Sequence, residues 1–143
     1  MKKVKLFLAV FAVLVVSAVV MAFERPVSIT NLPAGAQAFV TTHFKGQQVF
    51  FAEKNFFECE CHLSNGTQID FSNNGDWKKI DCNDFEIVPA SVIPAPIKHF
   101  VKANFPGCFV NKIEKKFYGY SVDLSNDIEL IFNKQGALLR MDD

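Results

Sequence analysis

The stretch LSNGTQIDFSNNGDW, from Leu63 to Trp77, has a counterpart in LSNDIELIFNKQGAL, from Leu124 to Leu138. Leu, Ser, Asn, Phe and Gly occupy the same places in both stretches, which lie 61 residues apart without a gap. An internal repeat of this kind constrains the fold of a short chain before any local pattern does.

The same shift aligns Leu32–Asp81 with Ile93–Asp142. Identical pairs along this alignment include Pro33/Pro94, Phe39/Phe100, Val40/Val101, Phe44/Phe105, Gly46/Gly107, Glu53/Glu114, Phe56/Phe117, Phe71/Phe132 and Gly75/Gly136. Two copies are too few for an open solenoid. The pattern therefore predicts one compact domain made of two tandem units of about 61 residues, at about 24–82 and 85–143.

Each unit has the pattern of a helix followed by strands. Apolar residues recur at spacings of three and four after Pro33 and again after Pro94, which is typical of a helix with one buried face. These residues are Ala36, Phe39, Val40 and Phe44 in the first unit and Ile97, Phe100, Val101 and Phe105 in the second. Gly46 and Gly107 end the two helices.

The clearest strand is Phe57–Leu63, and its apolar residues alternate with polar ones. Phe57, Cys59, Cys61 and Leu63 alternate with Glu58, Glu60 and His62, and in the second unit Tyr118, Tyr120, Val122 and Leu124 alternate with Gly119, Ser121 and Asp123. This period of two predicts half-buried strands. Weaker strands are expected at Val49–Lys54 and Asn111–Lys115. A turn at Asn65-Gly66 precedes a strand with Ile69 and Phe71, and a turn at Asn73–Gly75 precedes one with Trp77 and Ile80.

These elements predict an α+β fold in which a helix packs on an antiparallel β-meander, twice over. Residues shared by both units are expected to serve this scaffold, and function is expected in residues that the units do not share. The substitution of Gly66-Thr67 by Asp127-Ile128 predicts that the two equivalent turns differ in shape.

The order of these motifs resembles the secreted bacterial PepSY-like, β-lactamase-inhibitor-like proteins. The residues that carry the resemblance are His43–Gly46, Cys59–Phe71, Gly75–Trp77 and Ile80–Cys82, and in the second unit Asn104–Gly107, Gly119–Asn126, Phe132 and Gly136. The resemblance implies an exported protein of two tandem units that binds and inhibits an enzyme through the exposed face of its sheet. It implies no catalytic residue.

The N-terminus has the pattern of a secretory signal peptide at residues 1–22. A head with Lys2, Lys3 and Lys5 is followed by an uncharged stretch up to Met21 and by the small residue Ala22. We expect cleavage after Ala22, which leaves a single domain at 23–143 in the periplasm or outside the cell. Retention as a membrane anchor is the alternative; otherwise contact with the membrane is expected only before cleavage.

The charge balance excludes nucleic acid as an expected partner. The full chain carries 15 basic and 15 acidic residues, so loss of the three N-terminal lysines leaves a mildly acidic domain. Nucleic-acid binding requires a basic cluster, and none is present.

The four cysteines, Cys59, Cys61, Cys82 and Cys108, are the strongest candidates for chemistry. Export favours disulfides, and a bond from Cys59 or Cys61 to Cys82 is one hypothesis. Buried free thiols are the other reading. A metal site formed by Cys59, Cys61 and His62 is disfavoured, since in a strand His62 points away from both cysteines.

No catalytic constellation is present, and the sequence predicts neither enzyme activity nor a cofactor. It contains no phosphate-binding loop, nucleophile elbow or zinc-binding helix. The leading hypothesis is a non-catalytic exported module that binds an unidentified protein of the cell envelope, such as a protease, through its polar sheet face. The residues expected on that face are Glu58, Glu60, His62, Gln68, Asp70, Ser121, Asp123 and Glu129. The alternative is a small-molecule or metal carrier that uses the concavity between the units and the cysteines.

Overall fold

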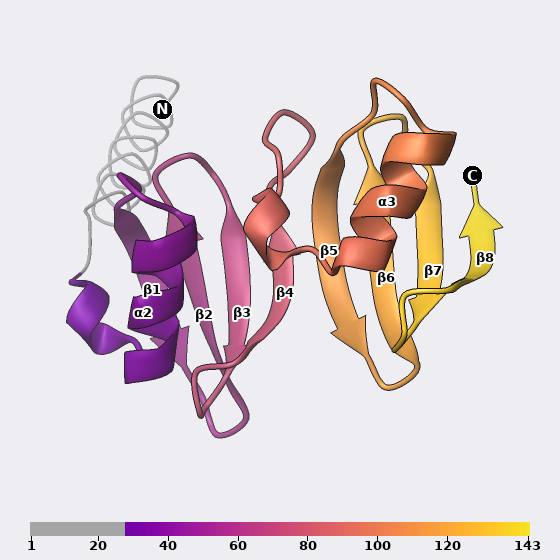
Figure 1. The fold of residues 1–143 in the computed structure, drawn as a ribbon. Coiled ribbons are helices and arrows are strands. Elements are labelled where there is room, and N and C mark those ends of the chain that lie inside the picture. The colour runs from indigo at the N-terminus through magenta and orange to yellow at the C-terminus, as the bar shows by residue number, and fades with distance from the viewer. Residues whose placement is uncertain (1–27) are drawn as a thin grey trace, which may run out of the picture.

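The computed structural model describes residues 28–143, so the expected signal peptide lies outside the described residues. In chain order the elements are η1 (Ile29–Asn31), α2 (Ala34–His43), β1 (Val49–Lys54), β2 (Glu58–Leu63), β3 (Gln68–Ser72), β4 (Trp77–Asp81), η2 (Ala90–Val92), α3 (Ala95–Asn104), β5 (Val110–Lys116), β6 (Gly119–Leu124), β7 (Glu129–Asn133) and β8 (Leu138–Asp142) (Figure 1). From residue 28 onward, no helix is long and apolar enough to cross a membrane.

The strands form one antiparallel sheet of eight strands in the order of the sequence, from β1 to β8. Each element from η1 to β4 has a counterpart that begins 61 residues later, as α2 at Ala34 and α3 at Ala95 illustrate. Irregularities in the register also recur at equivalent positions, between Val49 and Phe51 on β1 and between Val110 and Lys112 on β5. The α+β class predicted from the sequence is confirmed.

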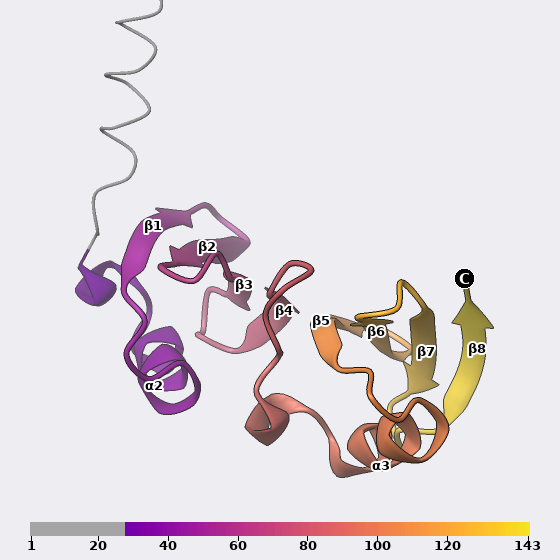
Figure 2. The same ribbon diagram turned by 90° about the horizontal axis from the view of Figure 1, so that it is seen from above.

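Both helices cover the same face of the sheet, and the core lies between them and the strands (Figure 2). Phe39 of α2 packs edge-on against Phe71 of β3 with ring centroids 5.7 Å apart, and Phe100 of α3 packs in the same way on Phe132 of β7 at 5.5 Å. Phe71 and Phe132 are fully buried. The predicted apolar helix faces are therefore the faces that contact the sheet.

The alternation predicted for β2 holds for Cys59, Cys61 and Leu63, which are buried on the helix side. Phe57 was expected on that buried face, but it precedes the strand and is 83% exposed. Its backbone N–H donates to the Asn55 side chain in the β1–β2 hairpin, which removes Phe57 from the ladder. The prediction for this residue is wrong because the strand begins one position later than the pattern suggested.

The two equivalent turns after β2 and β6 have the same shape, so the predicted difference between them is wrong. Gly66 has φ +87° and Asp127 has φ +67°, and both backbone N–H groups donate to the carbonyl of the leucine three residues earlier. Asp is one of the few non-glycine residues that enter this left-handed region without a large penalty. The substitution therefore preserves the turn.

The start of each helix packs against a turn of the sheet. A Cβ atom added to Gly75, which has φ +94°, would lie 2.8 Å from Cα of Gly35 and 2.9 Å from the nitrogen of Ala36. Backbone atoms of α2 therefore approach the β3–β4 turn more closely than any larger residue permits. This contact fixes where the helix begins on the sheet.

We expect Gly75→Ala to lower the free energy of unfolding by about 2–4 kcal/mol, because it combines left-handed backbone strain with a clash against α2. Gly46→Ala is the matched control, since Gly46 has φ +81° but open space around its Cβ position. The control should lose only the strain, about 1–2 kcal/mol. Urea denaturation of both variants measures this, and equal losses would contradict the close packing at Gly75.

Candidate functional site

All eight residues predicted for the polar face lie on the side of the sheet opposite the helices. In one row across the strands, Glu60, Asp70 and Ser121 are linked through Lys79 of β4 and Glu114 of β5. A second row runs through His62, Gln68, Asp81, Lys112, Asp123, Glu129 and Asp142. Glu58 lies one pair beyond the first row, opposite Ser72. We call this surface the polar face, and nothing among residues 28–143 packs over it as the helices do on the other side (Figure 2).

Ion pairs cross or follow the strands of the polar face, and they include basic residues that the sequence analysis missed. Glu58 accepts from Lys78 at 3.0 Å, Asp70 lies 3.4 Å from Lys79, and Glu114 lies 3.0 Å from Lys116. His62 Nε2 lies 2.6 Å from Glu60 Oε1. The lysines of β4 and β5 could have been found from the period of two, which places Lys79, Lys112 and Glu114 on the same side as the carboxylates.

The electrostatic environment is most acidic around Asp123. Burial raises the pKa of Asp123, Lys112 opposes the shift, and the nearby carboxylates of Glu129, Asp81 and Glu114 add to it. A carboxylate crowded by carboxylates favours a cation or a basic side chain at this place, because such a group relieves the repulsion. The β4–β7 part of the polar face therefore suits a positively charged group.

Exposed aromatic side chains mark one end of the sheet. Phe56 and Phe57, in the β1–β2 hairpin, are 94% and 83% exposed, and Phe117, in the β5–β6 hairpin, is 89% exposed. In a sheet whose strands follow sequence order, these two hairpins lie at the same end. Phe56 and Phe117 are identical residues at equivalent positions, so the expectation that shared residues serve the scaffold is wrong for this pair. Their position between two predicted strands was the signal that could have identified them.

All four cysteines are free in the structure. Cys59, Cys61 and Cys82 are buried on the helix side, whereas Cys108 is partly exposed. Burial raises the pKa of Cys61 to about 12 and that of Cys82 to about 11. Burial also raises the pKa of Cys59, against the opposing charge of Lys54. These buried thiols stay protonated at neutral pH, so they are poor nucleophiles and poor metal ligands.

Within residues 28–143, no group of three or more His, Cys, Asp or Glu side chains has the geometry to hold a metal ion. His62 lies on the polar face, with its ring 5.3 Å from that of Phe51. His43, the last residue of α2, shares a hydrogen bond of 2.8 Å with the Ser91 hydroxyl of η2. His99 is an exposed residue of α3. The histidines are thus spread over three places in the fold.

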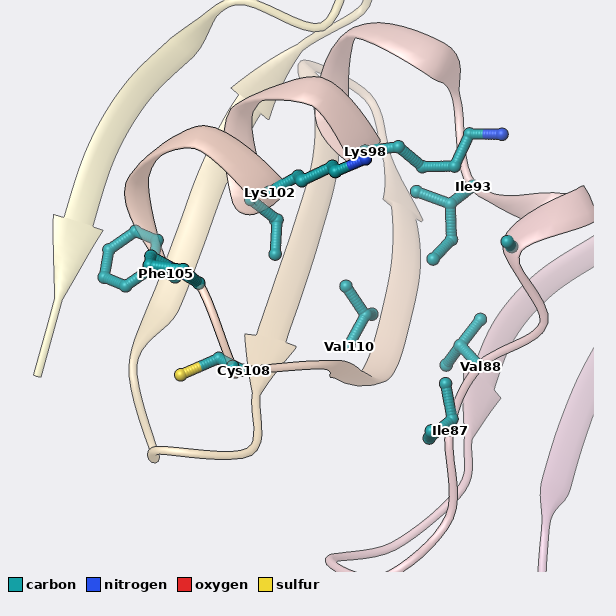
Figure 3. A pocket seen from close by; sticks show the side chains of 12 residues that line it. Ile87, Val88, Ile93, Lys98, Lys102, Phe105, Cys108 and Val110 are labelled. Atoms are coloured by element: carbon teal, nitrogen blue, oxygen red, sulfur yellow. The ribbon is translucent and has the colours of Figure 1, made fainter.

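A pocket of about 490 Å³ lies between α3, the segment before it and the start of β5 (Figure 3). Val88, Ile93, Phe105 and Val110 line it, and Cys108 is the one cysteine that reaches it. Lys98 and Lys102 of α3 also border it. A smaller pocket of about 380 Å³ occupies the equivalent place in the first half, next to Val40 and Phe44. The pair indicates that the cavities follow from the fold, whereas the two lysines belong to the second half alone.

The geometry defines a class of protein: an antiparallel sheet covered by helices on one side, with a charged open face and exposed hairpin aromatics on the other parts of its surface. The family described as "Putative beta-lactamase-inhibitor-like, PepSY-like" matches residues 57–140. The chain belongs to this family.

Two solved structures are similar over most of the chain. One, from Bacteroides thetaiotaomicron, is described as "a putative calcium-regulated periplasmic protein"; it is 34% identical, covers 83% of this chain and 96% of its own, and has a TM-score of 0.75. Another, from Bacteroides vulgatus, is described as "a putative periplasmic protein", with 32% identity, the same coverage and a TM-score of 0.74. A comparison with curated proteins gives no match. The descriptions of the relatives support a periplasmic location.

We expect iodoacetamide at pH 8 to label Cys108 first, because the other three thiols are buried and keep their protons. Mass spectrometry of peptides after a short reaction measures this order. After unfolding without reductant, all four cysteines should react. Fewer than four labels would reveal a disulfide and would contradict the free thiols of the structure.

Proposed function

We propose that this protein is a non-catalytic binding module of the cell envelope that holds a protein partner against its polar face. The observation that carries this proposal is the continuity of that face across β2 to β8, with partly exposed charges from both halves and no helix over it (Figure 2). The tandem organisation of two units and cleavage after Ala22 are part of the same proposal. The family description as inhibitor-like supports an enzyme as the partner.

The charges of the polar face suggest what the partner presents. Carboxylates outnumber basic groups around Asp123, and the pairs on the face are partly open to water, as in the case of Glu60 and His62. A partner with Lys or Arg side chains on a loop or an edge would gain from this potential and would be attracted to it at long range. Binding should therefore weaken as the salt concentration rises.

The exposed phenylalanines at the hairpin tips supply the apolar contribution. An exposed Phe costs free energy in water and recovers it when a partner covers the ring. Phe56 and Phe117 lie in different halves at the same end of the sheet. A partner that contacts both would span the junction of the halves, and central aromatic anchors commonly carry most of the binding energy of an interface.

The test is a pull-down from periplasmic extract with the wild-type protein and two pairs of variants. Glu60→Lys combined with Glu129→Lys should abolish recovery of the partner, since it reverses charge at both halves of the polar face. Glu86→Lys is its control, because Glu86 is exposed in the loop between β4 and η2. Phe56→Ser with Phe117→Ser should reduce recovery at least tenfold, the loss of roughly 1.4 kcal/mol or more that a buried anchor contributes.

Phe85→Ser is the control for the aromatic variant, because Phe85 is 90% exposed at the other end of the sheet. Both controls should recover the partner as the wild type does. No specific partner with the wild type, or equal recovery with all variants, would count against a protein-binding face.

A second candidate is a carrier of small anionic amphiphiles, favoured by the apolar pocket bordered by Lys98 and Lys102. An apolar chain would contact Ile93 and Phe105, and an anionic head would lie near the lysines. A fluorescent medium-chain fatty acid is the probe. Binding that is lost in the Lys98→Glu, Lys102→Glu double variant would support this function, and no binding would remove it.

A further inference from the structure

The sheet ends in two edges that no other strand of residues 28–143 covers. β1 pairs with β2 alone, and β8 pairs with β7 alone, at opposite ends of the curved sheet (Figure 2). β8 carries exposed apolar side chains, with Met141 52% and Leu139 57% exposed. An exposed edge with apolar residues favours pairing with another strand unless the protein blocks it.

The junction of β4 with β5 shows how such an edge is paired inside this molecule. Lys79 lies opposite Glu114, Ile80 opposite Ile113, and Asp81 opposite Lys112. Ile80 and Ile113 are both fully buried. Beyond the ladder, the Cys82 N–H donates to the Asn111 carbonyl at 2.8 Å. The junction thus combines a charge pair, an apolar pair and backbone hydrogen bonds.

Shifting this junction by 61 residues in each direction relates it to the free edges. β8 is the counterpart of β4, and β1 is the counterpart of β5. Arg140 then takes the place of Lys79 and Glu53 that of Glu114, so the basic and acidic partners are preserved. Met141 and Ala52 replace the two isoleucines as an apolar pair.

The first pair of this register also relieves an unfavourable contact. Glu53 of β1 lies opposite Glu60 of β2, and like charges directly opposite each other destabilise a sheet. In the internal junction the equivalent residue, Glu114, has Lys79 opposite it and Lys116 at 3.0 Å. Arg140 is 68% exposed and is paired only with Asp142 of its own strand at 2.9 Å. An arginine beside Glu53 would complete the alternation of charges.

We propose that β8 of one copy of this protein pairs antiparallel with β1 of a second copy, in the register of the β4–β5 junction. The contact uses different surfaces on the two copies, so it continues as a chain of molecules or closes as a ring. The bulges of β1 and β8 do not prevent it, because β5 and β4 have irregularities at the same positions and still pair. A ladder of three residue pairs makes a small interface, so the association is weak and depends on concentration.

The first test is sedimentation equilibrium of the chain recovered from the periplasm, up to about 1 mM, where even an interaction with a Kd of 1 mM is populated. The mean mass should rise with concentration. Arg140→Glu and Glu53→Arg should each reduce the association at least threefold, and the double variant should restore it because the charges are exchanged. Lys134→Glu is the control, since Lys134 is exposed in the β7–β8 turn. A constant monomer mass, or no recovery in the double variant, overturns the proposal.

The second test separates head-to-tail pairing from symmetric pairing. N–H groups of alternate residues in a strand point to the same neighbour. Because Cys82 and Asn111 bond across the internal junction, Met141 and Ala52 direct their N–H groups to the free edges. Met141→Pro therefore blocks β8, and Ala52→Pro blocks β1, without removing a hydrogen bond inside the sheet.

Each proline variant alone should be a monomer, and an equal mixture should form a dimer that grows no further, since it retains one intact β8 and one intact β1. A dimer formed by either variant alone would indicate symmetric pairing and overturn the proposal. Thermal unfolding shows whether each variant is folded, and the charge exchange decides the question if either proline variant is not.

Discussion

The pairing of β4 with β5 is the contact on which the rest of the structure depends. It is a short ladder with Ile80 opposite Ile113, both out of contact with water. Without it the two halves would be two small sheets, each with a helix, and each too small to bury a sufficient core. With it they form one sheet with one helix side and one polar face. The charges that matter for binding are therefore brought together by an apolar contact on the opposite side.

This arrangement favours recognition over catalysis. The titratable groups of the polar face are paired with neighbours at its surface, as Glu58 is with Lys78 and Glu60 with His62, and they are not gathered in an enclosed cavity. The cysteines, which have the strongest pKa shifts, are shifted toward the unreactive thiol by burial. Exposed aromatics and an acidic region around Asp123 are instead features of surfaces that bind proteins.

Much of the fold could be predicted from the sequence, because the apolar positions of α2, α3 and β2 follow simple periods and occur twice. Phe57 was misplaced because an apolar residue at the start of an alternating run has the same pattern in a strand or in a turn. The turn at Asp127 was misjudged because Asp can adopt the backbone of glycine. The lysines that join the halves electrostatically lie on β4 and β5, and their relation to the carboxylates depends on long-range pairing that no local pattern contains. The side on which the helices lie was equally beyond local patterns.

The most direct measurement is photo-crosslinking in cells with a photoreactive amino acid placed at His62, at Ser121 or at Thr42. His62 and Ser121 lie on the polar face in different halves, whereas Thr42 is exposed on α2. The account predicts an adduct of the same mass from His62 and Ser121, and none from Thr42. Adducts from Thr42 alone, or different partners from the two polar positions, would contradict a single binding face built by the β4–β5 junction.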